Sequence, residues 1–154
     1  MEFIEGPRPS ACFFCEAAAL PQGQEAERLV LARSPRALVL MNLYPYSNGH
    51  LLVAPTAHVA DLEELDLEAA GELTALTRRS LRALRMALSP DGFNLGMNLG
   101  QVAGAGVADH LHQHLVPRWS GDTNFMPVLG DVKVMSEHIR VTYDKLRAAF
   151  DALS

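Results

Sequence analysis

Short apolar runs separated by turn residues occupy the first third of the chain. Residues 29–31 and 37–41 are apolar and flank Ser34-Pro35-Arg36, so they predict two strands joined by a turn. The segment 42–49 is rich in turn-forming residues, and the apolar run 50–54 follows it. We therefore predict a third strand over residues 50–54.

The spacing of apolar positions changes between residues 60 and 88. Leucine and alanine recur there mostly three to five positions apart, with Glu and Arg between them, which predicts a long amphipathic helix. A similar pattern over 131–154 predicts a C-terminal helix. Residues 93–98 predict a fourth strand, and the glycine-rich segment 99–106 predicts a loop.

Residues 110–116 read His, Leu, His, Gln, His, Leu, Val and stand directly before Pro117. This alternation has a period of two, which is typical of a strand with one polar face. We predict a fifth strand here, with the side chains of His110, His112 and His114 on one face and about 7 Å between neighbours.

Composition narrows the classes of function. A chain of 154 residues with 49% hydrophobic residues is long enough for one domain with a core, and we expect a single domain. It contains no apolar run of transmembrane length, and its first residues lack a signal-peptide pattern, so we expect a cytoplasmic protein. The net charge of −5 disfavours nucleic acid and membrane lipid as partners.

Three histidines on one strand face suggest phosphoryl or nucleotidyl chemistry. Imidazole is neutral and nucleophilic near pH 7, and the phosphoramidate that it forms is readily cleaved again. The neighbouring glycine-rich loop could donate backbone N–H groups to phosphate oxygens, although an ordinary turn is an equal explanation for it. The alternatives for the histidines are a metal site made of these three residues or a solvated strand face.

Cys12 and Cys15 have the spacing of a zinc-binding pair. Tetrahedral zinc needs two further ligands, and no other cysteine is present, so histidine is the remaining strong candidate. The candidate histidines are His50, His58, His110 and His138. His50 precedes an apolar strand and could instead be a core or nucleotide-side histidine, so His58 is the stronger candidate of the two. A redox pair and two unligated cysteines are the alternatives, and a redox pair lacks the βαβ setting that would support it.

At this point the sequence resembles the histidine triad (HIT) family. Residues 110–116 match the pattern His-φ-His-φ-His-φ-φ, with φ apolar, except that Gln113 stands in an apolar slot. Segment 42–50, segment 49–55 with His58 after it, and segment 116–119 are also similar to that family. Segment 108–127 resembles a bacterial branch that includes diadenosine tetraphosphate phosphorylases.

The resemblance implies an α+β fold with a five-stranded antiparallel sheet, a long central helix and a C-terminal helix. It implies one HIT-like domain over 1–154, with an N-terminal zinc-binding segment over 1–28, and a homodimer. The long helix and the third strand are our candidates for the dimer interface.

The resemblance also implies the roles of site residues. His112 would attack the α-phosphate and His114 would hold phosphate, while the first triad residue, His110, would join Cys12, Cys15 and His58 around a structural zinc ion. A closed site of two cysteines and two histidines would be neutral and would clamp the N-terminal segment onto the histidine strand.

The nucleotide contacts implied by the resemblance are Asn42, Asn98, Gln101, Gly106 and Val107. Asn42 would contact the ribose, although a turn-forming asparagine is an alternative. Val107 stands where family members often have Ser or Thr, so part of the usual leaving-group contact would have to come from elsewhere.

The leading hypothesis is an enzyme that binds a purine nucleotide or dinucleoside polyphosphate and cleaves it at the α-phosphate through a nucleotidyl-histidine. Water as acceptor would make it a hydrolase, and phosphate would make it a diadenosine tetraphosphate phosphorylase. A nucleotide-binding module with little catalysis is an alternative that Gln113 and Val107 favour. A small enzyme that uses zinc directly is a further alternative.

Overall fold

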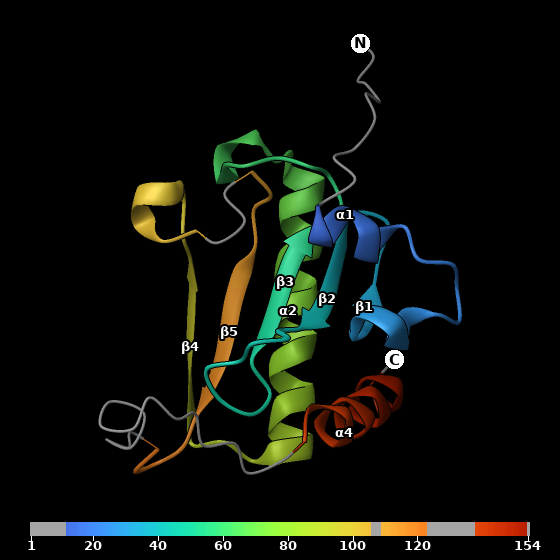
Figure 1. Ribbon diagram of the computed structural model, residues 1–154, viewed down its shortest axis with the longest axis vertical. Helices are drawn as coiled ribbons and strands as arrows, with labels where there is room; N and C mark the ends of the chain where they lie inside the picture. Colours follow the sequence, from blue (N-terminus) through green and yellow to red (C-terminus); the bar gives the residue numbers. More distant parts are fainter. Residues whose placement is uncertain (1–11, 106–108, 123–137, 154) are drawn as a thin grey trace.

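The computed structural model describes residues 12–105, 109–122 and 138–153. Five strands form one antiparallel sheet in the order β1-β2-β3-β5-β4 (Figure 1). The strands are β1 (Val30–Arg33), β2 (Ala37–Met41), β3 (Leu51–Pro55), β4 (Gly92–Met97) and β5 (Gln113–Arg118). The α-helices are α1 (Phe13–Ala18), α2 (Leu67–Leu88) and α4 (Ile139–Ala152). Short 3-10 helices are η1 (Glu25–Arg28), η2 (Leu62–Glu64) and η3 (Gln101–Ala103). The predicted α+β class and the five-stranded antiparallel sheet are confirmed.

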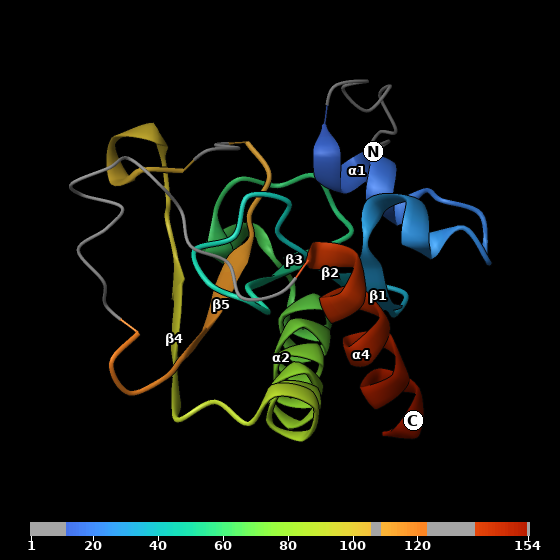
Figure 2. The same cartoon turned by 60° about the horizontal axis from the view of Figure 1, so that its bottom comes forward.

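The two faces of the sheet are covered differently. Helices α2 and α4 lie side by side against one face (Figure 2), and alternate strand residues such as Val39, Val53 and Leu115 point into that core. The intervening residues, including Leu38, Leu40 and Leu52, form a second core with α1. Because β2 and β3 are buried along their whole length, both read as continuous apolar runs in the sequence.

Turns tie the sheet to α2. Glu72 on α2 accepts hydrogen bonds from the Ser34 hydroxyl and the Arg36 backbone N–H, each at 2.6 Å, which fixes the turn between β1 and β2. Gly49, in the connection between β2 and β3, has φ of +79°, and a Cβ there would lie 2.6 Å from Leu88 Cδ1. Glycine is therefore required at this close approach.

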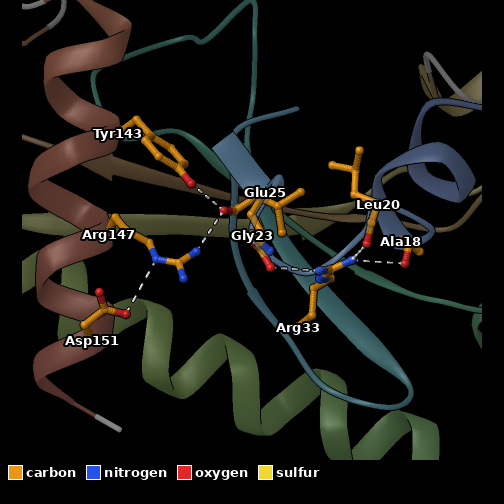
Figure 3. Close-up of polar contacts among 9 residues, drawn as sticks. Ala18, Leu20, Gly23, Glu25, Arg33, Tyr143, Arg147 and Asp151 are labelled. Atoms are coloured by element: carbon orange, nitrogen blue, oxygen red, sulfur yellow. Dashed lines mark hydrogen bonds and ion pairs between the residues drawn. The ribbon is translucent and has the colours of Figure 1, made fainter. Parts of the chain in front are cut away.

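The N-terminal segment and α4 are both anchored on β1 (Figure 3). The Arg33 guanidinium donates hydrogen bonds to the carbonyl oxygens of Ala18, the last residue of α1, at 3.3 Å and of Leu20, just after the helix, at 2.6 Å. On the other side, the Tyr143 hydroxyl donates to the Val30 carbonyl at 2.8 Å. Strand β1 thus holds an element against each face of the sheet.

The helices differ from the prediction at their ends. The predicted helix 60–88 is divided, because Asp66 has extended backbone and its carboxylate accepts a hydrogen bond from the Ala69 N–H, so that α2 begins at Leu67. His138 is also extended and caps α4 at its start. The rest of the predicted C-terminal helix, residues 131–137, lies outside the described residues.

The strand that carries the histidines also differs from the prediction. Strand β5 begins at Gln113 rather than at His110, and residues 110–112 have irregular backbone. The strand continues through Pro117, which lies beyond Leu115, the last residue that pairs with β3. A proline is tolerated there because β5 has only one neighbouring strand at that point. In the described residues we find no helix that is long and apolar enough to cross a membrane.

Candidate active site and metal cluster

The period of two predicted that the three alternating histidines lie in one row on a strand. The structure does not place all three on a strand. Only His114 belongs to β5, and it lies opposite Leu52 of β3 and Gly96 of β4. His112 lies two residues before it, and the two ring centroids are 5.1 Å apart. His110 is fully buried and its Nδ1 atom points to the cysteines. Strand β5 therefore carries only His114, and the irregular segment 110–112 before it carries the other two.

Cys12, Cys15, His58 and His110 come together on the sheet face that α1 covers, with their ligand atoms all within 4.8 Å of one another. The Cys12 Sγ to His110 Nδ1 distance is 3.4 Å, and the Cys15 Sγ to His58 Nδ1 distance is 3.3 Å. The two Nδ1 atoms are 3.1 Å apart. Tetrahedral zinc with ordinary bond lengths gives edges of about 3.5 Å for S and N and about 3.3 Å for two N atoms. The four residues thus have the donor set and spacing of a closed tetrahedral metal site.

The outer nitrogens of the two clustered histidines have partners that orient the inner ones. His110 Nε2 lies 2.9 Å from the Pro55 carbonyl oxygen, which can only accept, so Nε2 carries the proton and Nδ1 presents its lone pair to the cluster. His58 Nε2 lies 3.4 Å from the Asp109 carboxylate in the same arrangement. Burial lowers the pKa of His110 to about 4, which keeps the ring neutral at physiological pH.

His112 has the opposite tautomer. Its Nδ1 lies 2.9 Å from the carbonyl oxygen of His110 and must donate the hydrogen, so the lone pair is on Nε2. The side chain is buried, with 7% of its surface exposed. A neutral imidazole with one nitrogen fixed as a donor and the other free of a proton has the form of a nucleophile or a general base.

A hydrogen bond from His50 fixes the tautomer of His114. The Tyr46 backbone N–H donates to His50 Nδ1 at 3.1 Å, so His50 carries its proton on Nε2. That Nε2 lies 3.0 Å from His114 Nδ1 and donates to it, which leaves the His114 proton on Nε2. Burial and the neighbouring His112 lower the pKa of His114. His114 therefore presents a neutral N–H donor beside the lone pair of His112.

Comparison with known proteins gives this arrangement a family. The family model described as the HIT domain matches residues 23–121. The chain belongs to the HIT domain family. It is 47% identical over 124 residues to the AP-4-A phosphorylase of Mycobacterium tuberculosis, a match that covers 80% of this chain and 63% of that protein. It is 30% identical over 108 residues to the adenosine 5'-monophosphoramidase hnt1 of Schizosaccharomyces pombe, covering 70% of this chain and 74% of that protein.

A solved structure in the same family resembles the whole fold. The Zn-bound histidine triad family protein from Mycobacterium smegmatis superposes with a TM-score of 0.73 at 28% identity, over 93% of this chain and 95% of that chain. The chain spans less than two thirds of the length of the AP-4-A phosphorylase relative. Family and fold are therefore established, and they agree with the resemblance drawn from the sequence.

The nucleotide contacts expected from the HIT resemblance lie in two loops. Asn42 has a structural role: its Oδ1 accepts the Tyr44 N–H at 2.9 Å, which forms a turn, and its Nδ2 lies 3.4 Å from His50 Nδ1. Asn98 Nδ2 donates to the Gly104 carbonyl at 3.5 Å across the glycine-rich loop. Gln101 is exposed at the start of η3. Gly106 and Val107 lie outside the described residues.

The departure at Gln113 has a local explanation. Gln113 points to the opposite face of the sheet from His112 and His114, and its Oε1 accepts a hydrogen bond from the Thr77 hydroxyl of α2 at 2.7 Å. The polar side chain is thus paired with a polar group of the helix that covers this face. Gln113 belongs to the packing behind the site.

Several residues of the site were missed or left undecided by the sequence analysis. For His50 the sequence left a zinc ligand and a core or nucleotide-side histidine both open; it is fully buried, contacts His114 and lies apart from the cluster. Asp109, directly before the histidine run, orients His58. Phe14, between the two cysteines, packs on His110 and His112. The placement of Phe14 inside the Cys-x-x-Cys motif was a signal that it would lie near any cluster formed by the pair.

Proposed function

We propose that this HIT domain is an enzyme that transfers or hydrolyses the nucleotidyl group of a nucleoside phosphate derivative, with His112 as the nucleophile. The observation that carries the proposal is the fixed tautomer of His112, whose Nδ1–H donates to the His110 carbonyl and leaves Nε2 unprotonated. His114, with Nε2–H available, stands beside it to donate to phosphate oxygens.

The first step forms a bond between His112 Nε2 and the α-phosphorus and breaks the bond from that phosphorus to the leaving-group oxygen. The leaving group departs with the electron pair of that bond. In the second step an acceptor oxygen attacks the same phosphorus, the N–P bond breaks, and the electron pair returns to His112 Nε2. The hydrogen bond from Nδ1 to the His110 carbonyl stabilises the positive charge on the ring of the nucleotidyl-histidine.

The substrate class follows from the relatives. Two HIT relatives are named for adenine nucleotides, as an AP-4-A phosphorylase and an adenosine 5'-monophosphoramidase. We infer that this chain binds a purine nucleotide or a dinucleoside polyphosphate such as diadenosine tetraphosphate. The nucleotide would run from the connection that holds Asn42 towards the loop that holds Asn98 and Gln101.

We further propose that the cluster of Cys12, Cys15, His58 and His110 holds a structural zinc ion. Four protein donors complete a tetrahedral shell and leave no position for a substrate, so this site does not favour the hypothesis of direct zinc catalysis. The Zn-bound HIT neighbour supports zinc as the metal for such a chain. The ion would join α1 to residue 110 and to the segment after β3, and the chemistry would stay on the histidines.

A homodimer is our proposal for the assembly. Strand β3 is internal in the sheet and is buried along its whole length, so we place the interface elsewhere. Strand β4 is an edge strand, and Leu95 on it is 46% exposed. We propose that two copies meet along β4. Light scattering after size exclusion should give twice the chain mass for the wild type and one chain mass for Leu95→Lys; a monomeric wild type contradicts this assembly.

The decisive experiment is intact-protein mass spectrometry after brief mixing with diadenosine tetraphosphate. We expect a mass gain of one adenylyl group on the wild-type chain and none on His112→Asn, which has no basic ring nitrogen. A wild-type chain that turns over without an adduct, or a His112→Asn variant with wild-type turnover, contradicts the mechanism. Product analysis with and without phosphate then identifies the acceptor, because phosphorolysis yields ADP where hydrolysis yields AMP.

A further inference from the structure

Phe14 lies where the metal cluster meets the proposed nucleophile. Its ring stacks on the His112 ring, with centroids 4.9 Å apart and an interplanar angle of 27°. The same ring contacts His110 at 5.1 Å and 31°. Phe14 is 1% exposed and has no polar atom in its side chain, so its role in the site is one of shape and packing.

The Phe14 ring restricts rotation of the His112 imidazole, a motion that the hydrogen bond of His112 does not prevent. The bond from Nδ1 to the His110 carbonyl anchors one side of the imidazole, but a single hydrogen bond allows the ring plane to rotate about it. A phenyl ring stacked on one face restricts that rotation. The direction of the Nε2 lone pair therefore depends on where Phe14 stands.

The position of Phe14 in turn depends on the cluster. Helix α1 has six residues, which is too short to be stable alone, and Phe14 lies between Cys12 and Cys15 at its start. The two sulfur atoms face His110 and His58 at 3.4 Å and 3.3 Å. At its other end the segment is held by Arg33 through the carbonyls of Ala18 and Leu20. The end that carries Phe14 is thus held by the cysteines together with the packing of Phe14 in the second core.

We propose that Phe14 is a positioning residue that transmits the geometry of the Cys12, Cys15, His58 and His110 cluster to His112. This inference rests on the proposed function, because it takes His112 as the nucleophile. Attack at phosphorus requires the lone pair to be aligned with the breaking bond, and small errors in aim are costly. The cluster would then contribute to the rate through packing while taking no part in the chemistry.

The test compares Phe14→Leu with Phe13→Leu. Both residues begin the same helix, and both substitutions remove one phenyl ring, but Phe13 is half-buried and has its ring edge-on to Phe14 at 5.2 Å. We expect Phe14→Leu to slow adenylylation of His112 by about 10- to 100-fold in single-turnover mixing, with the AMP dissociation constant within about threefold of wild type. Phe13→Leu should stay within about twofold in both. Equal effects of the two variants contradict the proposal.

A spectroscopic measurement separates positioning from loss of fold. A phenyl ring stacked at 4.9 Å shifts the ring protons of His112 in NMR spectra. We expect that shift to be lost in Phe14→Leu and in the second variant Phe14→Met, and kept in Phe13→Leu, with circular dichroism showing all three folded. A Phe14 variant that loses the shift and adenylylates at the wild-type rate overturns the proposal.

Coupling to the cluster is tested by a double-mutant cycle with Cys12→Ser. If the cluster acts through Phe14, the combined variant should be no slower than the slower single variant within about threefold, whereas independent effects would multiply. The His112 proton shift should also change in Cys12→Ser. Multiplying effects, or an unchanged shift, contradict the coupling. A wild-type chain that forms no adenylyl adduct contradicts the proposed function. The His112 proton shift in Cys12→Ser, a variant that keeps the phenyl ring, still decides whether the cluster sets the position of Phe14 against His112.

Discussion

His110 and His114 stand four residues apart and differ in what surrounds their ring nitrogens. His110 donates through Nε2 to a backbone carbonyl and presents Nδ1 to two thiols and a second imidazole. His114 accepts at Nδ1 from His50 and presents Nε2–H beside His112. The partner of one nitrogen decides in each case what the other can do, as a lone pair for a metal or a donor for phosphate. In our proposal the same side chain thus serves a structural cluster at one end of the run and chemistry at the other.

The largest expected effect is the loss of nucleotidyl transfer on substitution of His112, with the metal cluster left intact. Substituting His112→Asn removes the nucleophilic nitrogen and should lower nucleotidyl transfer by about four orders of magnitude or more. Zinc content should stay at that of the wild type, because His112 is not in the cluster. Single-turnover kinetics and metal analysis on the same sample check both statements. Loss of zinc from His112→Asn would show that the metal cluster and the catalytic histidines are not independent of each other.

The reverse experiment removes a cluster ligand. Cys15→Ser should lose bound zinc and several kcal/mol of unfolding free energy, because metal binding to such a site is coupled to folding. Chelator should destabilise the wild type by a similar amount and leave Cys15→Ser unchanged. Denaturant unfolding followed by circular dichroism measures this. If chelator does not change the unfolding free energy of the wild type, the cluster holds no metal in solution.

Substitution of His50 alone should lower the rate of nucleotidyl transfer without touching the metal cluster. His50→Ala removes the donor that fixes the His114 tautomer, and we expect transfer to slow by about 10- to 100-fold with zinc content unchanged. Tyr46→Phe is the matched control, since it keeps both the backbone N–H that His50 accepts and the stacked ring. An equal loss of rate in the control would place the effect in the loop and not in the proton arrangement.

The sequence predicted the fold better than the backbone of the site. Strands β2 and β3 and helix α2 were found because apolar periodicity reports burial, and both β2 and β3 are buried throughout. The expectation that His110, His112 and His114 share a strand failed because alternation over seven residues does not distinguish a strand from an irregular segment that precedes one, as at residues 110–112. The roles of His50 and Asp109 depend on contacts between distant segments, which no local pattern carries.

Gln113 tests whether a departure from the family pattern affects the chemistry. Thr77→Val leaves the Gln113 carbonyl oxygen without the hydroxyl donor and should cost about 1–2 kcal/mol of unfolding free energy, with the transfer rate of the folded enzyme unchanged. Thr74→Val, at an exposed position of the same helix, should stay within about 0.5 kcal/mol of wild type. A slower enzyme with unchanged stability would instead place Gln113 in the catalytic machinery.

The smallest effect concerns the charge of His114. Burial, and then the neighbouring His112, lower the pKa of His114 below its ordinary value of 6.5. Above pH 6.5 the ring is neutral in both folded and unfolded chains; as the pH falls below 6.5, the unfolded chain takes up the proton first, so the contribution of His114 to stability declines towards the folded pKa. We expect NMR titration of the His114 ring to give a midpoint below 6.5, and His50→Ala to raise it by admitting water to the ring. A midpoint at or above 6.5 in the wild type would contradict the lowering of the His114 pKa by burial, because the folded chain would then hold the proton at least as well as a free imidazole.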